Sequence, residues 1–306
     1  MEASLLFGNG INRLSTSNIS WEALLQEIKG PRPFEDDQLP NTMIYERIIL
    51  EAPPKWKELL NDEYETKIRI AAILDRMAPN ELYTRLLDMK FRHYLTTNYD
   101  NAFLYTNIFS DKVIRPVSGD NSESIYSIRR SKKFRTTRQQ EKTLWQIHGE
   151  IGKPATLMLG LDHYCGAIGK VDAYLKGRYS YNIGGADVVE KSITDKLSDN
   201  SFSGSSWIET FFSTDLHILG LGLDFSEIDL WWMLNKRARL KRSKDFGQLI
   251  KNEIVYYCIG LDHQLEGVLS ALGVTIRKFG PLSGSKKFER FYSNVLEVLE
   301  KEVGST

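Results

Sequence analysis

Near its N-terminus the chain reads Leu5-Leu6-Phe7-Gly8-Asn9-Gly10-Ile11-Asn12. Three apolar residues followed by two glycines predict a short buried strand that enters a tight turn. Behind this turn, apolar residues recur at helical spacing over residues 21–28, and Gly30-Pro31 ends the expected helix. A strand, a glycine turn and a helix in this order are typical of the first unit of a parallel α/β sheet.

Short apolar runs that end in polar or glycine residues recur along the rest of the chain. We expect strands at residues 94–97, 144–147, 156–159, 216–219, 254–259 and 274–276. The last expected helix, over residues 288–299, has an apolar face. This alternation predicts an α/β fold, a Rossmann-like parallel sheet with helices on both faces.

Residues 35–91 have a helical pattern and predict a mainly helical insertion, or small lobe, within a single domain of residues 1–306. Residues 161–206 are a second candidate insertion. Their second part, residues 177–206, is rich in glycine, serine, asparagine and aspartate and is expected to be a mobile loop.

The composition is that of a globular protein. The 306 residues are 42% hydrophobic and 26% charged, which permits a substantial core. Forty basic and forty acidic residues cancel, which argues against a general nucleic-acid binder. Two cysteines cannot form a disulfide framework or a four-thiolate zinc site, and no apolar run approaches the ~20 residues of a membrane span. With no signal peptide at its start, the chain is expected to be cytoplasmic.

Glycine turns follow two of the expected strands, at Gly8-Asn9-Gly10 and Gly220-Leu221-Gly222. Such turns let the backbone approach a pyrophosphate and present amide groups to it, although each also fits an ordinary strand-to-helix turn. The third glycine of the dehydrogenase fingerprint is replaced by Arg13, which disfavours a standard nicotinamide dehydrogenase. Asp224, after the second turn, could bind a sugar hydroxyl or cap a helix.

Polar side chains follow two further strands. Asn98 can position a water through its amide, and Asp100 can contact the same ligand or hold the loop. An Asx-turn explains the same residues without a ligand. His148 follows the next strand and is a natural general base near neutral pH, although single histidines are more often structural. The five histidines show no metal-ligand spacing.

Four motifs occur in a fixed order: Gly8-Asn9-Gly10-Ile11-Asn12, Thr96-Thr97-Asn98-Tyr99-Asp100, Ile147-His148-Gly149-Glu150 and Gly220-Leu221-Gly222-Leu223-Asp224. This ordered set resembles the sirtuin-like family, in particular its bacterial anti-phage NADase branch, and it spans nearly the whole chain. The resemblance implies that NAD⁺ is bound as a substrate.

The resemblance also implies a role for each motif. The first would contact the pyrophosphate through Gly8, Asn9, Gly10 and Asn12. The second would lie beside the nicotinamide ribose with Asn98 and Asp100, and the third would supply a catalytic His148. The fourth would contact the adenosine ribose through Gly220, Gly222 and Asp224.

Departures from the family pattern favour hydrolysis of the cofactor over deacylation. The chain lacks the thiols of the four-cysteine zinc module of deacetylase sirtuins, so no zinc is expected. The resemblance therefore implies an NAD⁺ glycohydrolase that depletes NAD⁺ during phage infection. An NAD-dependent protein deacylase and a non-catalytic nucleotide-binding regulatory module remain as alternatives.

An NADase needs an off state, and the family implies control by homo-oligomerisation or by a partner, such as a hexameric HerA-type ATPase. The basic segment 129–142 is a candidate docking or gating loop. No direct contact with nucleic acid or a membrane is expected.

Overall fold

The computed structural model describes residues 1–30, 39–51, 59–106, 115–116, 125–135 and 140–304, with only the backbone of residues 59–62 and 115–116. The strands are β1 (Ala3–Phe7), β2 (His93–Thr96), β3 (Arg115–Pro116), β4 (Ser131–Arg135), β5 (Glu141–Gln146), β6 (Ser180–Ile183), β7 (Ala186–Val189), β8 (Asp215–Leu219), β9 (Ile254–Cys258) and β10 (Thr275–Lys278). The α-helices are α1 (Trp21–Lys29), α2 (Asn41–Leu50), α3 (Leu59–Leu74), α4 (Glu81–Leu87), α5 (Ala102–Tyr105), α6 (Leu161–Leu175), α7 (Ile193–Asp199), α8 (Thr210–Ser213), α9 (Ile228–Lys241), α10 (His263–Ala271) and α11 (Lys287–Glu302). The short 3₁₀ helices of the described residues are η1 (Asn9–Leu14), η2 (Pro154–Thr156), η3 (Trp207–Glu209) and η4 (Gly247–Leu249).

One mostly parallel sheet forms the centre of the molecule and confirms the predicted α/β fold. Its strand order is β10-β9-β8-β1-β2-β5-β4-β3. The strands from β10 to β5 run parallel, and β4 and β3 are antiparallel additions at one edge. Strand β1 lies between β2 and β8, with Leu5 opposite both Tyr94 and His217.

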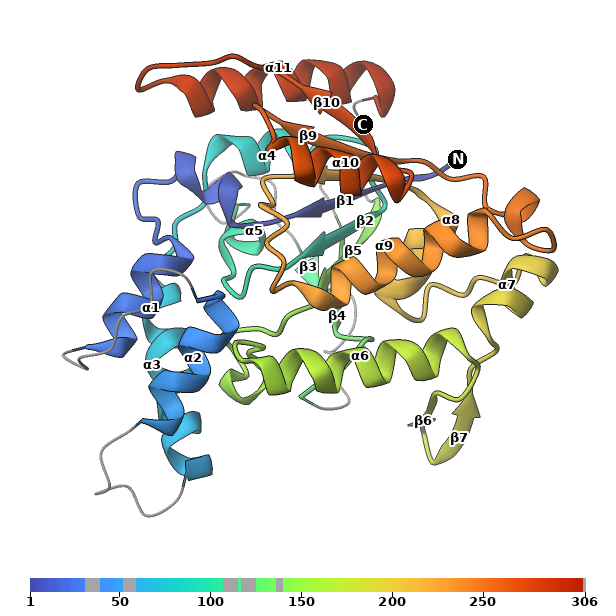
Figure 1. The fold of residues 1–306 in the computed structure, drawn as a ribbon, viewed down its shortest axis with the longest axis horizontal. Helices are drawn as coiled ribbons and strands as arrows, with labels where there is room; N and C mark the ends of the chain where they lie inside the picture. Colours follow the sequence, from blue (N-terminus) through green and yellow to red (C-terminus); the bar gives the residue numbers. More distant parts are fainter. Residues whose placement is uncertain (31–38, 52–58, 107–114, 117–124, 136–139, 305–306) are drawn as a thin grey trace.

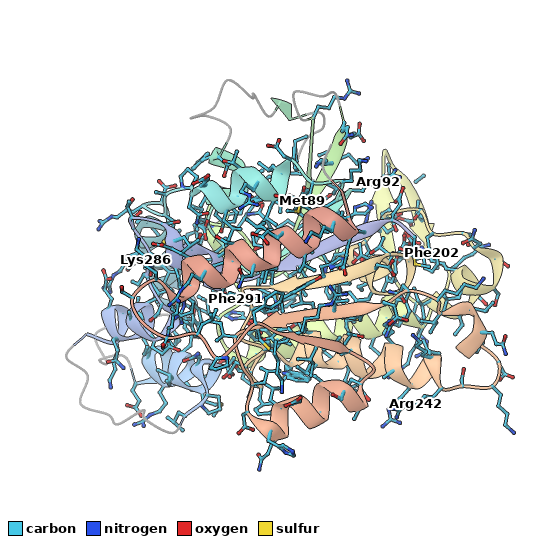
Figure 2. All side chains as sticks on the ribbon, turned by 90° about the horizontal axis from the view of Figure 1, so that it is seen from above. Met89, Arg92, Phe202, Arg242, Lys286 and Phe291 are labelled. Carbon is cyan, nitrogen blue, oxygen red and sulfur yellow. The ribbon has the colours of Figure 1, made fainter. Side chains whose placement is uncertain are left out.

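Alternate residues of the strands point to opposite faces, and each face is covered by helices. Leu5 and Phe7 belong to a core shared with α4 and α11, whereas Leu6 belongs to a core shared with α6 and α9. Figure 2 shows α11 lying across the strands on the first face, where Phe291 packs inward. The burial of both faces explains why the strands are apolar runs rather than alternating ones.

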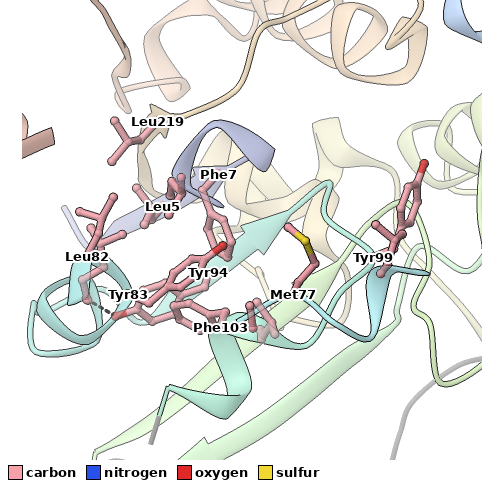
Figure 3. Close-up of a cluster of buried hydrophobic side chains, with 14 of the residues drawn as sticks. Leu5, Phe7, Met77, Leu82, Tyr83, Tyr94, Tyr99, Phe103 and Leu219 are labelled. Carbon is pink, nitrogen blue, oxygen red and sulfur yellow. Dashed lines mark hydrogen bonds between the residues drawn. The ribbon is translucent and has the colours of Figure 1, made fainter. Parts of the chain in front are cut away.

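Aromatic rings fill the first core beneath β1 and β2. Figure 3 shows Phe7, Tyr83, Tyr94 and Phe103 side by side. The ring centroids of Tyr94 and Phe103 lie 4.9 Å apart, and those of Phe7 and Phe103 lie 5.2 Å apart. Offset and edge-to-face contacts of this kind stabilise a core beyond the burial of area alone.

Helices α1, α2 and α3 stand together beside the sheet and form a helical lobe, at the left of Figure 1. Helices α2 and α3 fall within residues 35–91, where the sequence predicts a helical insertion, and α1 precedes them. Residues 31–38 and 52–58 of this region lie outside the described residues. None of the helices in the described part of the chain combines the length and apolar character needed to cross a bilayer.

Two expectations for the chain between β5 and β8 are wrong. Residues 156–159 are not a strand, because Pro154 begins a 3₁₀ turn and the following residues are extended without pairing. Residues 177–206 are not simply a loop, because they contain the β6–β7 hairpin and α7. Gly184 and Gly185 both have positive φ, as a two-residue hairpin turn requires.

A buried ion cluster explains why residues 177–206 are ordered. The Nζ atom of Lys196 lies 2.5 Å from carboxylate oxygens of both Glu190 and Glu209 and 3.0 Å from the hydroxyl of Tyr174. The cluster joins α7, η3 and α6.

The basic segment at residues 129–142 is not the expected loop, since residues 131–135 form β4. Arg129 and Arg130 are buried, and Lys132 lies 2.5 Å from a carboxylate oxygen of Glu150. The basic side chains of Arg129, Arg130 and Lys132 therefore lie against other residues of the protein. Residues 136–139 lie outside the described residues.

The loops that follow β1 and β8 pack backbone against backbone. The amide of Gly8 donates to the carbonyl of Leu219 at 3.2 Å, and the amide of Gly10 donates to the carbonyl of Gly220 at 2.7 Å. A Cβ atom on Gly10 would lie 2.6 Å from the Gly220 oxygen, which is closer than real contacts allow. Glycine is needed here for the close approach of two loops.

Replacing Gly10 with alanine should lower the free energy of unfolding by about 1–3 kcal/mol, the usual cost of forcing an extra group into a filled space. Gly222→Ala is the matched control, because a Cβ there meets no atom within 4 Å. Urea denaturation of both variants measures the difference. Equal stabilities would contradict the close contact.

Candidate functional site

A cavity of about 1010 Å³ opens at the carboxyl ends of the parallel strands. The loops that follow β1, β2, β5, β8 and β9 line it, and the helical lobe adds Trp21, Thr42 and Leu74. This is the crevice beside a central strand where open α/β sheets bind their ligands. Segments that are far apart in the sequence therefore meet at one site.

His148 follows β5 at the wall of the cavity and is 1% exposed. Its Nε2 atom lies 3.0 Å from Oδ2 of Asp229, near the start of α9. Its Nδ1 atom lies 3.4 Å from the hydroxyl of Tyr164 on α6. The imidazole is thus oriented by a carboxylate, which is the arrangement that prepares a histidine for acid–base work.

The protonation of His148 reflects two opposing effects. Burial lowers the pKa of the imidazole, but the charge of Asp229 and its hydrogen bond outweigh burial, and Glu227 adds to them. The pKa of His148 therefore lies above its ordinary value of 6.5.

Asn98, in the loop after β2, lines the cavity and is 6% exposed. Its backbone amide donates to Oγ1 of Thr96 at 3.0 Å, which fixes the loop. Its side-chain Nδ2 atom is buried and makes no hydrogen bond of normal geometry among the described residues, although the Asn98 side chain lies near enough to Tyr83 to oppose the rise in the pKa of that hydroxyl. Buried amide groups in folded proteins are rarely left without a partner, so this one is a candidate ligand donor.

Asp100 lines the same cavity but is engaged by the protein. Its Oδ1 accepts from the amide of Ala102 at 2.9 Å, and its Oδ2 accepts from Nδ2 of Asn12 at 3.2 Å. Burial raises the pKa of this carboxyl, and the two hydrogen bonds oppose the rise. These contacts agree with the loop-holding role that the sequence left open for Asp100.

The first glycine turn does not offer the amides of Gly8 and Gly10 to a pyrophosphate, contrary to what the resemblance to sirtuin-like proteins implies. Because the amides of Gly8 and Gly10 donate to the carbonyls of Leu219 and Gly220, they cannot also donate to a phosphate. Asn9 and Gly10 still line the cavity. Gly8 lies behind them, against Leu221.

Asn12 is fully buried behind the cavity wall. Its side-chain oxygen accepts from the hydroxyl of Tyr83 at 2.6 Å, and its Nδ2 donates to Asn9 at 2.9 Å as well as to Asp100. It therefore positions Asp100 and Asn9 rather than facing a ligand.

Residues of the second glycine turn, Gly220, Gly222 and Asp224, all line the cavity. Gly220 has a φ of +65°, and a Cβ there would meet the backbone nitrogen of Ile11 at 2.9 Å. Oδ1 of Asp224 accepts from the amide of Ser226 at 2.8 Å and from its hydroxyl. This carboxylate closes a local turn at the cavity rim.

Three residues with charged side chains, Arg13, Glu22 and Glu227, line the cavity without having been predicted as site residues. Arg13 is the only lysine or arginine among the described lining residues, and its guanidinium lies 4.6 Å from the ring centre of Phe288. Glu227 stands immediately before α9, and its Oε2 atom is buried without a hydrogen-bond partner in the described part of the chain. In the sequence, Arg13 has the context of an ordinary turn residue and Glu227 that of an ordinary helix-start residue.

The carboxyl of Glu227 is a weaker acid than an ordinary glutamate. Burial raises its pKa, Asp229 and Asp224 raise it further, and His148 opposes them, so that the pKa of Glu227 rises to about 7. Carboxyls perturbed in this way inside a cleft are functional candidates.

Within the described residues, no group of three or more histidine, cysteine, aspartate or glutamate side chains is arranged to hold a metal ion. Neither a protein-family model nor a curated protein matches the chain.

Replacing Asp229 with asparagine should lower the pKa of His148 to below 6.5, because burial then acts without the compensating carboxylate. An NMR titration of ¹³C-labelled histidine measures this shift, with His148→Gln used to assign the signal. An unchanged pKa would show that Asp229 does not control the charge of the imidazole.

Proposed function

We propose that the protein is an NAD⁺ glycohydrolase, which cleaves the bond between nicotinamide and ribose to give nicotinamide and ADP-ribose. One observation carries this proposal: the unpartnered amide of Asn98 and the Asp229-held imidazole of His148 face one cavity. The order of motifs that resembles sirtuin-like NADases supplies the identity of the substrate.

The size of the cavity and one lining arginine, Arg13, support a dinucleotide. At about 1010 Å³ it lies at the upper end of the usual range of ligand sites, roughly 300–1,000 Å³. Arg13 offers a guanidinium to a diphosphate, the kind of group that arginine recognises best. Asp100 and Glu227, which both line the cavity, suit the positive charge of the nicotinamide ring and of the sugar that forms when it leaves.

Cleavage of the nicotinamide–ribose bond requires correct positioning of the substrate and water, and it does not require a general acid. Nicotinamide leaves as a neutral molecule, taking the electron pair of the C–N bond, so its departure requires no proton. The ribose passes through an oxocarbenium-like state, as in other glycoside hydrolysis. Asn98 would orient the attacking water or the ribose, and His148 would act as a base on a ribose hydroxyl or on the water. Asp100 would keep the Asn98 loop in place.

The same resemblance supplies the biological setting of the proposal. Depletion of NAD⁺ would serve anti-phage defence by abortive infection, under the control of homo-oligomerisation or of a partner such as a hexameric HerA-type ATPase. An unregulated NADase would be toxic to its own cell, so an inactive state is required.

Asn98→Ala and His148→Gln should each lower kcat for NAD⁺ hydrolysis by about 10²–10⁴-fold, the range typical for loss of acid–base or positioning help. Glutamine at position 148 can still donate to Asp229, which avoids leaving a buried carboxylate unpaired. Chromatography with mass detection of nicotinamide and ADP-ribose measures the rates. His263→Ala, on the exposed start of α10, is the matched control.

Two outcomes would contradict the proposal, and an acetyl-lysine peptide added in parallel separates them. Nicotinamide release that occurs only with the peptide, together with an acylated ADP-ribose, would identify a deacylase. Thermal stabilisation by NAD⁺ without any product, also in the oligomeric or partner-bound form, would identify a binding module.

A further inference from the structure

Glu227 has no structural task that accounts for its position. It is the N-cap residue of α9, but its side chain makes no capping hydrogen bond. Its Oε2 atom is buried, lines the cavity wall and has no partner among the described residues. A buried carboxyl oxygen without a partner destabilises a fold, so such an atom is usually retained for a ligand or a reaction.

The surroundings of Glu227 place its carboxyl among the functional groups of the site. Its charge acts on His148 after β5, on Tyr99 after β2, on Tyr164 of α6 and on Tyr256 of β9. Asp224 and Asp229 of its own segment act on it in turn.

The neighbouring tyrosine hydroxyls are committed elsewhere. The hydroxyl of Tyr99 donates to the carbonyl of Met158 at 2.5 Å, and that of Tyr256 donates to the carbonyl of Leu221 at 2.7 Å. The hydroxyl of Tyr164 faces Nδ1 of His148 at 3.4 Å. The carboxyl of Glu227 therefore remains available to a molecule in the cavity.

Building on the glycohydrolase proposed above, we propose that Glu227 is a further catalytic residue, the general base that takes the proton of the attacking water. The water oxygen forms a bond to C1′ of the ribose as the bond from C1′ to nicotinamide breaks. The electron pair of the broken bond leaves with neutral nicotinamide. The proton of the water passes to the Glu227 carboxylate and then to solvent, so that NAD⁺ and water give nicotinamide, ADP-ribose and one proton.

This assignment gives Glu227 the proton transfer from water and leaves His148 to bind the ribose hydroxyl. Without Glu227, His148 would have to do both. Nε2 of His148 is occupied by Asp229, which favours the charged imidazolium, and only Nδ1 faces Tyr164 and the cavity side. His148 is suited to hold a ribose hydroxyl. Glu227, with a pKa near 7, is partly ionised at neutral pH and can accept a proton there.

The test compares Glu227→Gln with wild type and with Glu81→Gln, an exposed glutamate in the first turn of α4 that lies outside the cavity. The wild-type kcat should rise with pH through about 7, because a carboxyl must lose its proton to act as a base. In Glu227→Gln, kcat should fall by about 10²–10⁴-fold and this rise should vanish, while KM for NAD⁺ changes little. Glu81→Gln should match wild type.

The outcomes are distinguishable. Wild type that releases no nicotinamide, also in its oligomeric or partner-bound form, overturns both the glycohydrolase and the role of Glu227. An active wild type whose Glu227→Gln variant keeps its rate and its pH profile overturns the role of Glu227 alone. If Glu227→Gln does not fold, Glu227→Ala replaces it, with formate added as an external carboxylate. Restoration of activity by formate supports the proposal, and its absence contradicts it.

Discussion

The site depends on the backbone contact between the two glycine loops. Because Gly10 and Gly220 carry no side chains, the chain after β1 approaches the chain after β8 closely enough for an amide to reach a carbonyl at 2.7 Å. This contact fixes the turn that holds Asn12, and Asn12 in turn orients Asp100 at the end of β2. The absence of side chains at Gly10 and Gly220 thus determines the position of Asp100 after the neighbouring strand β2, in the wall of the cavity.

Much of the fold could be predicted from the sequence, because a sheet buried on both faces needs apolar strands. Each of those strands ends where the chain reaches polar surroundings, so Asn98 and His148 stood out as polar side chains at strand ends. The convergence of parallel strands at one edge then brings both to one cavity with Asp224, although the three are far apart in the sequence.

The rest depends on neighbours that a local pattern does not reveal. Glu227 has the sequence context of a surface helix-start residue, and its Oε2 atom is buried only because His148, Tyr164 and Tyr256 lie around its side chain. The β6–β7 hairpin pairs Tyr181 with Val188 and Ile183 with Ala186 on one face, but in the sequence glycines and polar residues surround this short alternation. The order around it comes from the charges of Lys196, Glu190 and Glu209 meeting inside the protein. That the amides of Gly8 and Gly10 are engaged by the neighbouring loop could not be predicted, because free and engaged amides look alike in a sequence.

The central position of β1 has a consequence for synthesis on the ribosome. It is made before every other strand, yet its two neighbours are β2 and β8, at residues 93–96 and 215–219. One edge of this apolar strand therefore has no native neighbour until most of the chain has been translated. Unpaired apolar edges are prone to aggregate, and long-range parallel pairing is slow. The nascent chain should therefore depend on chaperones until β8 emerges.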